Sequence, residues 1–178
     1  ADLETGKTEW EKLDSTRGVL LNNIITITED RLGRIWAGHP RRGISVYSPE
    51  TGEARTWLTE KNESPFGAYA SVLAPDGSVW FGTNTNGLWY YNDYSKPAAP
   101  SSCKKIIHPL LASGKPITGL ALYKSWLLIA ATDKVLLLNL DSFRIREKVI
   151  IRYLNPGEHD FTGVSEQNSI LLSKKDSS

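Results

Sequence analysis

The sequence repeats itself at an interval of 44 residues. One unit, residues 23–38, reads NIITITEDRLGRIWAG, and a second, residues 69–82, reads YASVLAPDGSVWFG. In both units an apolar segment leads into a turn that contains Asp and Gly, and the order apolar residue, Trp, one further residue, Gly then follows. The tryptophans at this position are Trp36 and Trp80. An interval of about 40–50 residues is typical of proteins built from one repeated supersecondary unit, such as propellers.

Beyond the tryptophan the two units continue alike. Residues 43–47 read GISVY and residues 87–91 read GLWYY, and a fourth apolar segment follows near residues 55–58 and 104–107. Val, Ile, Leu, Thr, Tyr and Trp dominate these segments, as they do in half-buried strands. The pair Asp76-Gly77 supplies the positive φ that a tight hairpin turn needs. Each unit therefore predicts four strands.

A third, less regular copy follows, and partial copies flank the series. We expect the strands of the third copy at residues 117–123, 126–131, 134–139 and 143–152, with Ile129 where the other copies have Trp. No segment shows a convincing helical periodicity.

One four-stranded sheet cannot bury both of its faces alone, whereas sheets packed radially bury them against each other. The sequence therefore predicts an all-β fold of β-propeller blades, meaning four-stranded antiparallel sheets arranged radially, in a partial or fragmentary propeller. We treat residues 1–178 as a single propeller segment. Its expected parts are a blade end at 8–14, blades at 22–60, 67–108 and 115–153, and a partial blade at 161–174. Other propeller blades or chains are expected to complete it.

Composition and motifs exclude several functions. The net charge of +1 gives no reason to expect a nucleic-acid partner, and no apolar run is long enough for a membrane segment. Cys103 is the one cysteine, and three scattered histidines cannot complete a zinc cluster with it. We expect no metal and no other cofactor. No catalytic motif is present, and Asp30 and Asp76 are interpreted as turn formers, so we expect a protein that is not an enzyme.

The loops between the second and third strands are the candidate site. In a propeller these loops share one face with the connections between blades, and loops on a rigid scaffold commonly carry function. Arg41 and Arg42 are suited to forking onto a carboxylate or phosphate, although a solvated loop tip is the simpler interpretation. The candidate ligand-binding residues are His39, Arg41, Arg42, Asn84, Asn86 and Asp133.

These motifs resemble the two-component regulator propeller repeat, found in the sensor ectodomains of bacterial hybrid histidine kinases. The resemblance rests on Glu29-Asp30, Gly33, the segment 35–38 and the segment 43–47, with counterparts at residues 76–91. It covers residues 20–92 well and 115–152 poorly. It implies a non-catalytic sensor that binds a small-molecule or glycan-type ligand. It also implies a periplasmic or extracellular location within a membrane-anchored receptor, and a cytoplasmic location stays open.

Two alternatives remain open. The chain is also compatible with a scaffold for protein–protein interaction that uses a blade edge or face. A propeller enzyme similar to the streptogramin lyases would need a cluster of His and acidic residues from several blades. Only His39, His108 and His159 are available for such a cluster.

Overall fold

The structure is a computed structural model, and it describes residues 18, 23–62, 64–112, 114–146 and 151–153. It contains three four-stranded antiparallel sheets, each with its strands in sequence order. The first sheet consists of β1 (Thr26–Glu29), β2 (Ile35–His39), β3 (Gly43–Ser48) and β4 (Glu53–Leu58). The second consists of β5 (Ala68–Leu73), β6 (Val79–Thr83), β7 (Leu88–Tyr91) and β8 (Lys104–Lys105). The third consists of β9 (Ile117–Tyr123), β10 (Trp126–Ala131), β11 (Lys134–Asn139) and β12 (Ile151–Tyr153).

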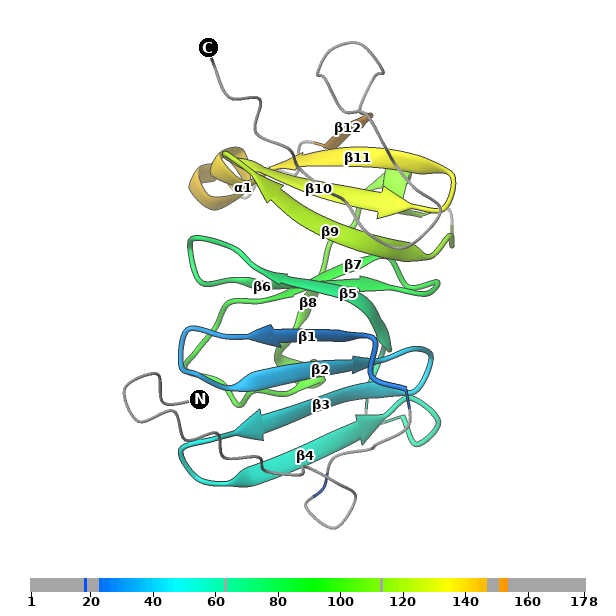
Figure 1. The fold of residues 1–178 in the computed structure, drawn as a ribbon. Coiled ribbons are helices and arrows are strands. Elements are labelled where there is room, and N and C mark those ends of the chain that lie inside the picture. The colour runs from blue at the N-terminus through cyan, green and yellow to red at the C-terminus, as the bar shows by residue number, and fades with distance from the viewer. Residues whose placement is uncertain (1–17, 19–22, 63, 113, 147–150, 154–178) are drawn as a thin grey trace, which may run out of the picture.

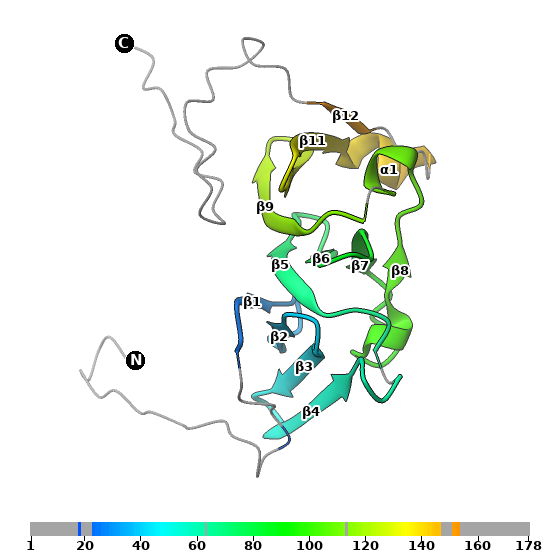
Figure 2. The same ribbon diagram turned by 90° about the vertical axis from the view of Figure 1, so that its right-hand side faces the viewer.

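The sheets are stacked as propeller blades. The innermost strands lie side by side, because β5 contacts both β1 and β9, and in Figure 2 the sheets fan outward from these strands toward β4, β8 and β12. Two threonine hydroxyls of β1, Thr26 Oγ1 and Thr28 Oγ1, lie 2.6 and 2.5 Å from Ser71 Oγ of β5. The expected fold class, blades of a partial propeller, is confirmed.

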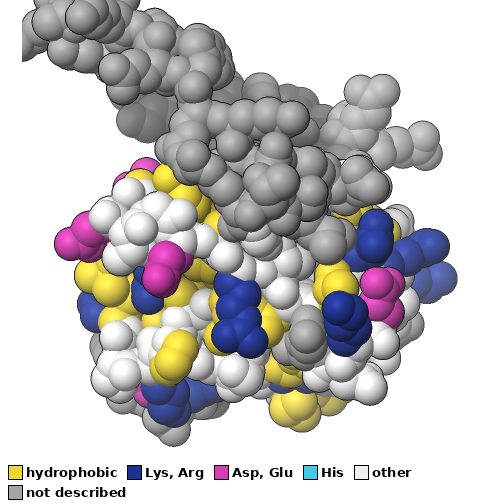
Figure 3. Space-filling model, turned by 90° about the horizontal axis from the view of Figure 1, so that it is seen from below, with side chains coloured by type: hydrophobic (Ala, Val, Ile, Leu, Met, Phe, Trp, Pro, Cys, Tyr) yellow, Lys and Arg dark blue, Asp and Glu magenta, His cyan; other side chains and the backbone are white. Residues whose placement is uncertain are grey.

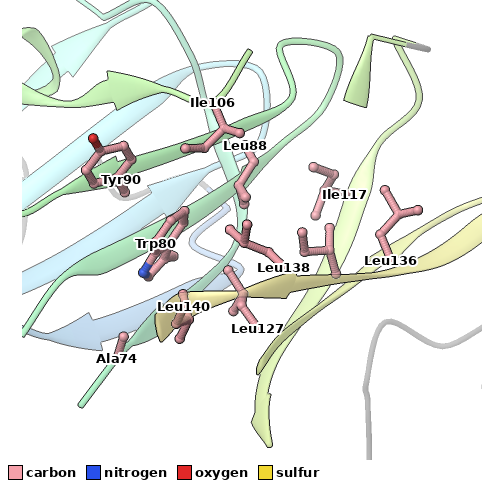
Figure 4. Packing of buried hydrophobic residues seen from close by; sticks show 11 residues of the cluster. Ala74, Trp80, Leu88, Tyr90, Ile106, Ile117, Leu127, Leu136, Leu138 and Leu140 are labelled. Carbon is pink, nitrogen blue, oxygen red and sulfur yellow. The ribbon is translucent and has the colours of Figure 1, made fainter. Parts of the chain in front are cut away.

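Each of the two interfaces between sheets has its own hydrophobic core, and the repeated tryptophans supply one large side chain to each. Trp36 of β2 packs against Phe81 and Tyr91 of the second sheet, with ring centroids 5.3 and 5.0 Å apart. Trp80 of β6 packs against the third sheet, among Leu127, Leu138 and Leu140 (Figure 4). Trp36 pairs with Val46 and Trp80 with Tyr90 across equivalent hairpins, so the two tryptophans occupy the same blade position.

The structure shifts the alignment of the third copy with the first two copies by one residue. Side chains alternate between the two faces of a strand. Ile129 lies in the same core as Trp80, so it faces back toward the second sheet, as Phe81 faces the first. The tryptophan position therefore falls on Leu128, and the placement of Ile129 there was wrong.

The strand expected at residues 143–152 is also corrected. Leu140–Arg146 forms the helix α1, and of the described residues in this stretch Ile151–Tyr153 pairs with β11, as β12. Asn139 Oδ1 accepts a hydrogen bond of 2.7 Å from Ser142 N, which is how an N-cap residue starts a helix. Among the residues that the structure describes, two short 3-10 segments also occur, Pro100–Ser102 (η2) and Pro109–Leu111 (η3) (Figure 1).

The division of the chain into blade segments stays a prediction. The blade end at 8–14 and the partial blade at 161–174 lie outside the described residues.

Candidate functional site

A pocket of about 290 Å³ lies where the first and second sheets meet. Four pieces of chain line it: Arg41 of the β2–β3 turn, Thr59 after β4, residues 65–67 of the connection between the sheets, and residues 83–86 of the β6–β7 turn. These turns and the connection lie at the right-hand side of Figure 1, the side that faces the viewer in Figure 2. The pocket therefore combines turns and a connection on one propeller face, as expected from the repeat.

The connection between the sheets packs tightly against the β2–β3 turn. Gly67 approaches so closely that a Cβ there would lie 2.4 Å from the His39 carbonyl oxygen and 2.7 Å from Arg41 N. Phe66 is buried and its ring centroid lies 4.9 Å from that of Trp89, while Ser64 Oγ donates a 2.7 Å hydrogen bond to the Phe66 carbonyl. Phe66 thus anchors the connection, which lines the pocket, to the core.

Asn86 fixes the β6–β7 turn, which also lines the pocket. Its Nδ2 donates to the Pro65 carbonyl at 2.8 Å, and its Oδ1 accepts from Lys105 Nζ at 2.5 Å. Its backbone carbonyl accepts a 3.0 Å hydrogen bond from Trp89 Nε1, and its backbone N–H donates to Thr83 Oγ1 at 3.0 Å. Asn86 therefore bridges the second sheet to the connection.

Three side chains that line the pocket do not take part in such structural hydrogen bonds. Arg41 is exposed, has a φ of 60°, and its carbonyl accepts a 2.6 Å hydrogen bond from Thr59 Oγ1. Within the described part of the chain, the side chains of Arg41, Asn84 and Thr85 have no hydrogen-bonding or ionic partner. They are the polar groups that a ligand in this pocket would meet.

The other candidate residues lie elsewhere. Arg42 Nη2 lies 3.8 Å from Glu60 Oε1 at the surface. His39 is fully buried, and its Nε2 lies 2.6 Å from Ser45 Oγ. Asp133 lies beside Lys134, with 3.7 Å between Oδ2 and Nζ, in the β10–β11 turn of the third sheet. The structure thus brings Arg41, Asn84 and Asn86 together and leaves the other three apart; ligand binding by all six stays a prediction.

The six candidate residues did not include Thr59, the connection 65–67, Thr83 or Thr85, although the loop of residues 83–86 belonged to the candidate face. The connection had a usable signal, because Pro65 and Gly67 flank Phe66 between two predicted blades. Gly next to an aromatic residue in such a place favours a close backbone approach. The contribution of Thr59 depends on how two sheets meet, which no local pattern contains.

The described histidines have structural partners. In addition to the His39–Ser45 contact, His108 Nδ1 accepts a hydrogen bond from Leu110 N at 3.2 Å, at the start of η3. In the part of the chain that the structure describes, no three His, Cys, Asp or Glu side chains gather as a metal site requires. None of the described helices is both long and apolar enough to cross a membrane.

No protein-family model matches this sequence, and no curated protein matches it either. Solved structures are similar to it. The extracellular domain of the hybrid two-component system BT4673 from B. thetaiotaomicron has a TM-score of 0.62 and 16% identity, over 85% of this chain and 19% of that one. The corresponding domain of BT3049 from the same organism has a TM-score of 0.56 and 20% identity, over 92% and 19%.

A third similar structure is PorZ, a surface component of the type-IX secretion system of Porphyromonas gingivalis. Its TM-score is 0.51 at 16% identity, over 72% of this chain and 20% of PorZ. The chain therefore spans about a fifth of the length of each of these proteins. At such identities the likeness shows the fold alone: this chain folds like part of these extracellular domains.

Proposed function

We propose that this chain is a non-catalytic segment of a sensing or interaction propeller, and that the pocket between its first two sheets receives a small molecule. One observation carries the proposal: the turns of two blades and their connection converge on a pocket with unengaged polar side chains. Small-molecule sites are typically concave, largely pre-formed and lined by a few convergent polar groups. The described pocket has this character.

The fixed walls support binding in particular. Phe66, Asn86 and the Arg41 carbonyl are held by a ring contact and by hydrogen bonds before any ligand arrives. A ligand then loses little affinity to the ordering of the site. An extracellular or periplasmic location is proposed with it, because BT4673 and BT3049 are extracellular domains of hybrid two-component systems. A glycan-type ligand is the class that we expect for such a sensor.

The experiment is a calorimetric screen of neutral and charged mono- and disaccharides against the chain. Thr85 is exposed at the pocket, so Thr85→Phe should fill the mouth and abolish binding. The matched control is Thr132→Phe at the counterpart turn of the third sheet, where Thr132 is also exposed. The control should bind as the unmodified chain does. Binding that survives Thr85→Phe would place the ligand elsewhere, and no binding by any sugar would contradict the proposal.

A scaffold function is the second candidate, and apolar side chains on β1 favour it. Ile27 of β1 is 64% exposed and Ile25, just before β1, is 43% exposed. Figure 3 views the molecule from the side of the first sheet, where hydrophobic side chains reach the surface among basic and polar ones. A surface of this kind suits contact with another protein surface, including another blade.

A further inference from the structure

The residues that line the pocket carry charge of one sign only. Arg41 is the single charged residue among those that line it, and none of the lining residues is acidic. Lys105 Nζ, bonded to Asn86, adds a second positive charge beside the wall. The neighbouring Arg42 differs, because Glu60 lies 3.8 Å from its guanidinium. Among these cations Arg41 is the one that lines the pocket, and it has no anionic partner in the described residues.

The backbone fixes where the Arg41 side chain begins. Its φ of 60° is in the left-handed region, which is unfavourable for a residue with a Cβ and persists where the surroundings determine it. Those surroundings are the hydrogen bond from Thr59 Oγ1 to the Arg41 carbonyl and the close approach of Gly67 to Arg41 N. The guanidinium, with its five N–H donors, is therefore presented from a fixed point.

The neutral groups of the pocket indicate the rest of a ligand. The Asn84 amide can both donate and accept, and the Thr85 hydroxyl can do the same. The amide of Asn86 already bridges Pro65 and Lys105. A volume of about 290 Å³ suits a molecule smaller than a drug-sized ligand, such as one sugar ring.

We propose that the pocket binds a hydroxylated ligand of monosaccharide size that carries a carboxylate or phosphate, with the oxyanion on Arg41 and hydroxyl groups on Asn84 and Thr85. This inference rests on the proposed function, that the pocket receives a small molecule. Arg recognises carboxylate and phosphate through paired N–H donors, and such charge-assisted hydrogen bonds are stronger than neutral ones.

The test uses three probes that share one ring and differ in charge: glucose, glucuronate and glucose 6-phosphate. Calorimetric titration should show at least one of the two anions binding about tenfold more tightly than glucose, the order that a charge-assisted hydrogen bond contributes. A preference for glucuronate identifies a carboxylate, and a preference for glucose 6-phosphate identifies a phosphate. In about 1 M salt the preference should shrink, since screening weakens the attraction.

Matched variants locate the effect. Arg41→Gln should reduce the affinity for the anion to that for glucose, whereas Arg42→Gln should leave the preference intact. Both should keep a melting temperature within about 2 °C of the unmodified chain, because both side chains are at the surface. Equal affinity for all three probes would overturn this inference and leave the proposed function standing. A preference that survives Arg41→Gln would overturn it as well, and no binding of any probe or other sugar would remove the proposed function too.

Discussion

At the scale of single residues, the two repeated tryptophans donate their buried indole N–H groups to different acceptors. A buried indole N–H needs an acceptor, because burial without one is costly. Trp36 Nε1 donates to Asp30 Oδ2 at 2.9 Å, while Trp80 Nε1 donates to Ser78 Oγ at 2.8 Å. Ser78 Oγ in turn lies 2.6 Å from Asp76 Oδ1. The β1–β2 and β5–β6 turns therefore close the hairpins and also supply the acceptors for the buried indole N–H groups.

Replacement of either tryptophan should be strongly destabilising. Trp36 is 1% exposed and Trp80 is 0% exposed. Trp36→Ala and Trp80→Ala should each lower the free energy of unfolding by about 3–5 kcal/mol, through lost burial and the cavity left behind. Denaturant unfolding curves measure this loss. A change below about 1 kcal/mol would mean that the side chains are not core residues.

Asp30 should matter more than Asp76. Asp30 is 2% exposed and accepts hydrogen bonds from Leu32 N, Arg34 N, Arg34 Nε and Trp36 Nε1. Asp30→Ala leaves buried donors without their acceptor and should cost about 3 kcal/mol or more. The matched control Asp76→Ala, at an exposed position, should cost about 1 kcal/mol. Equal losses in thermal or chemical unfolding would contradict this ranking.

The turn-forming role of both aspartates was predictable from sequence, and the hydrogen bonds that their carboxylates accept from Leu32 N and Ser78 N confirm it. The burial of His39 was not predictable. It is the last residue of β2, where the sequence alone does not say whether a side chain continues the strand alternation or joins the turn. In the structure it continues the alternation, on the face of Ala37 and away from that of Trp36.

At the scale of elements, the hairpins of the third sheet were predicted with their observed bounds, β9, β10 and β11. Apolar runs separated by short polar turns suffice for that. Which residues of β10 face the second sheet was ambiguous from sequence. The run Leu127-Leu128-Ile129 contains no Trp, so nothing in it distinguishes one face of the strand from the other. Helix α1 is only seven residues long, too short for its periodicity to stand out, although Asn139 was a usable N-cap signal.

Helix α1 should contribute to the core through Phe143. The Phe143 ring meets Trp80 and Tyr90 edge-on, with centroids 5.4 and 5.1 Å apart. Phe143→Ala should lower the free energy of unfolding by about 2–3 kcal/mol, less than Trp80→Ala, because Phe143 is only partly buried. Phe143→Leu, which keeps most of the apolar volume, should recover part of the loss. If Phe143→Ala is neutral in denaturant unfolding, the helix does not pack as described.

At the scale of the whole molecule, the first sheet has side chains suited to contact with a further blade. Ile35, Ala37 and Tyr47 correspond in the repeat to Val79, Phe81 and Tyr91, which pack on the preceding sheet. Ile27, paired with Ala37 across β1 and β2, lies on the same face and is 64% exposed. Ala37 and His39 on this face are already buried, so it is the exposed part around Ile27 that suits a neighbouring blade.

We therefore expect this chain to work within a larger propeller, with further blades from the same protein or from other chains. In isolation it should self-associate, which sedimentation at increasing concentration measures. Ile27→Lys places a charge on the face and should weaken association without loss of folding, since the side chain is exposed. A stable, soluble monomer at high concentration would contradict this expectation.

The middle sheet has one further property. Adjacent residues of β6 face in opposite directions: Trp80 toward the third sheet and Phe81 toward the first. In a stack of this kind the stability is close to a sum of blade terms and nearest-neighbour coupling terms, as in a one-dimensional Ising chain. Two consecutive positions of one strand thus report on two separate couplings. Unfolding followed from each position would show whether the stack melts as one cooperative unit or unzips one interface at a time.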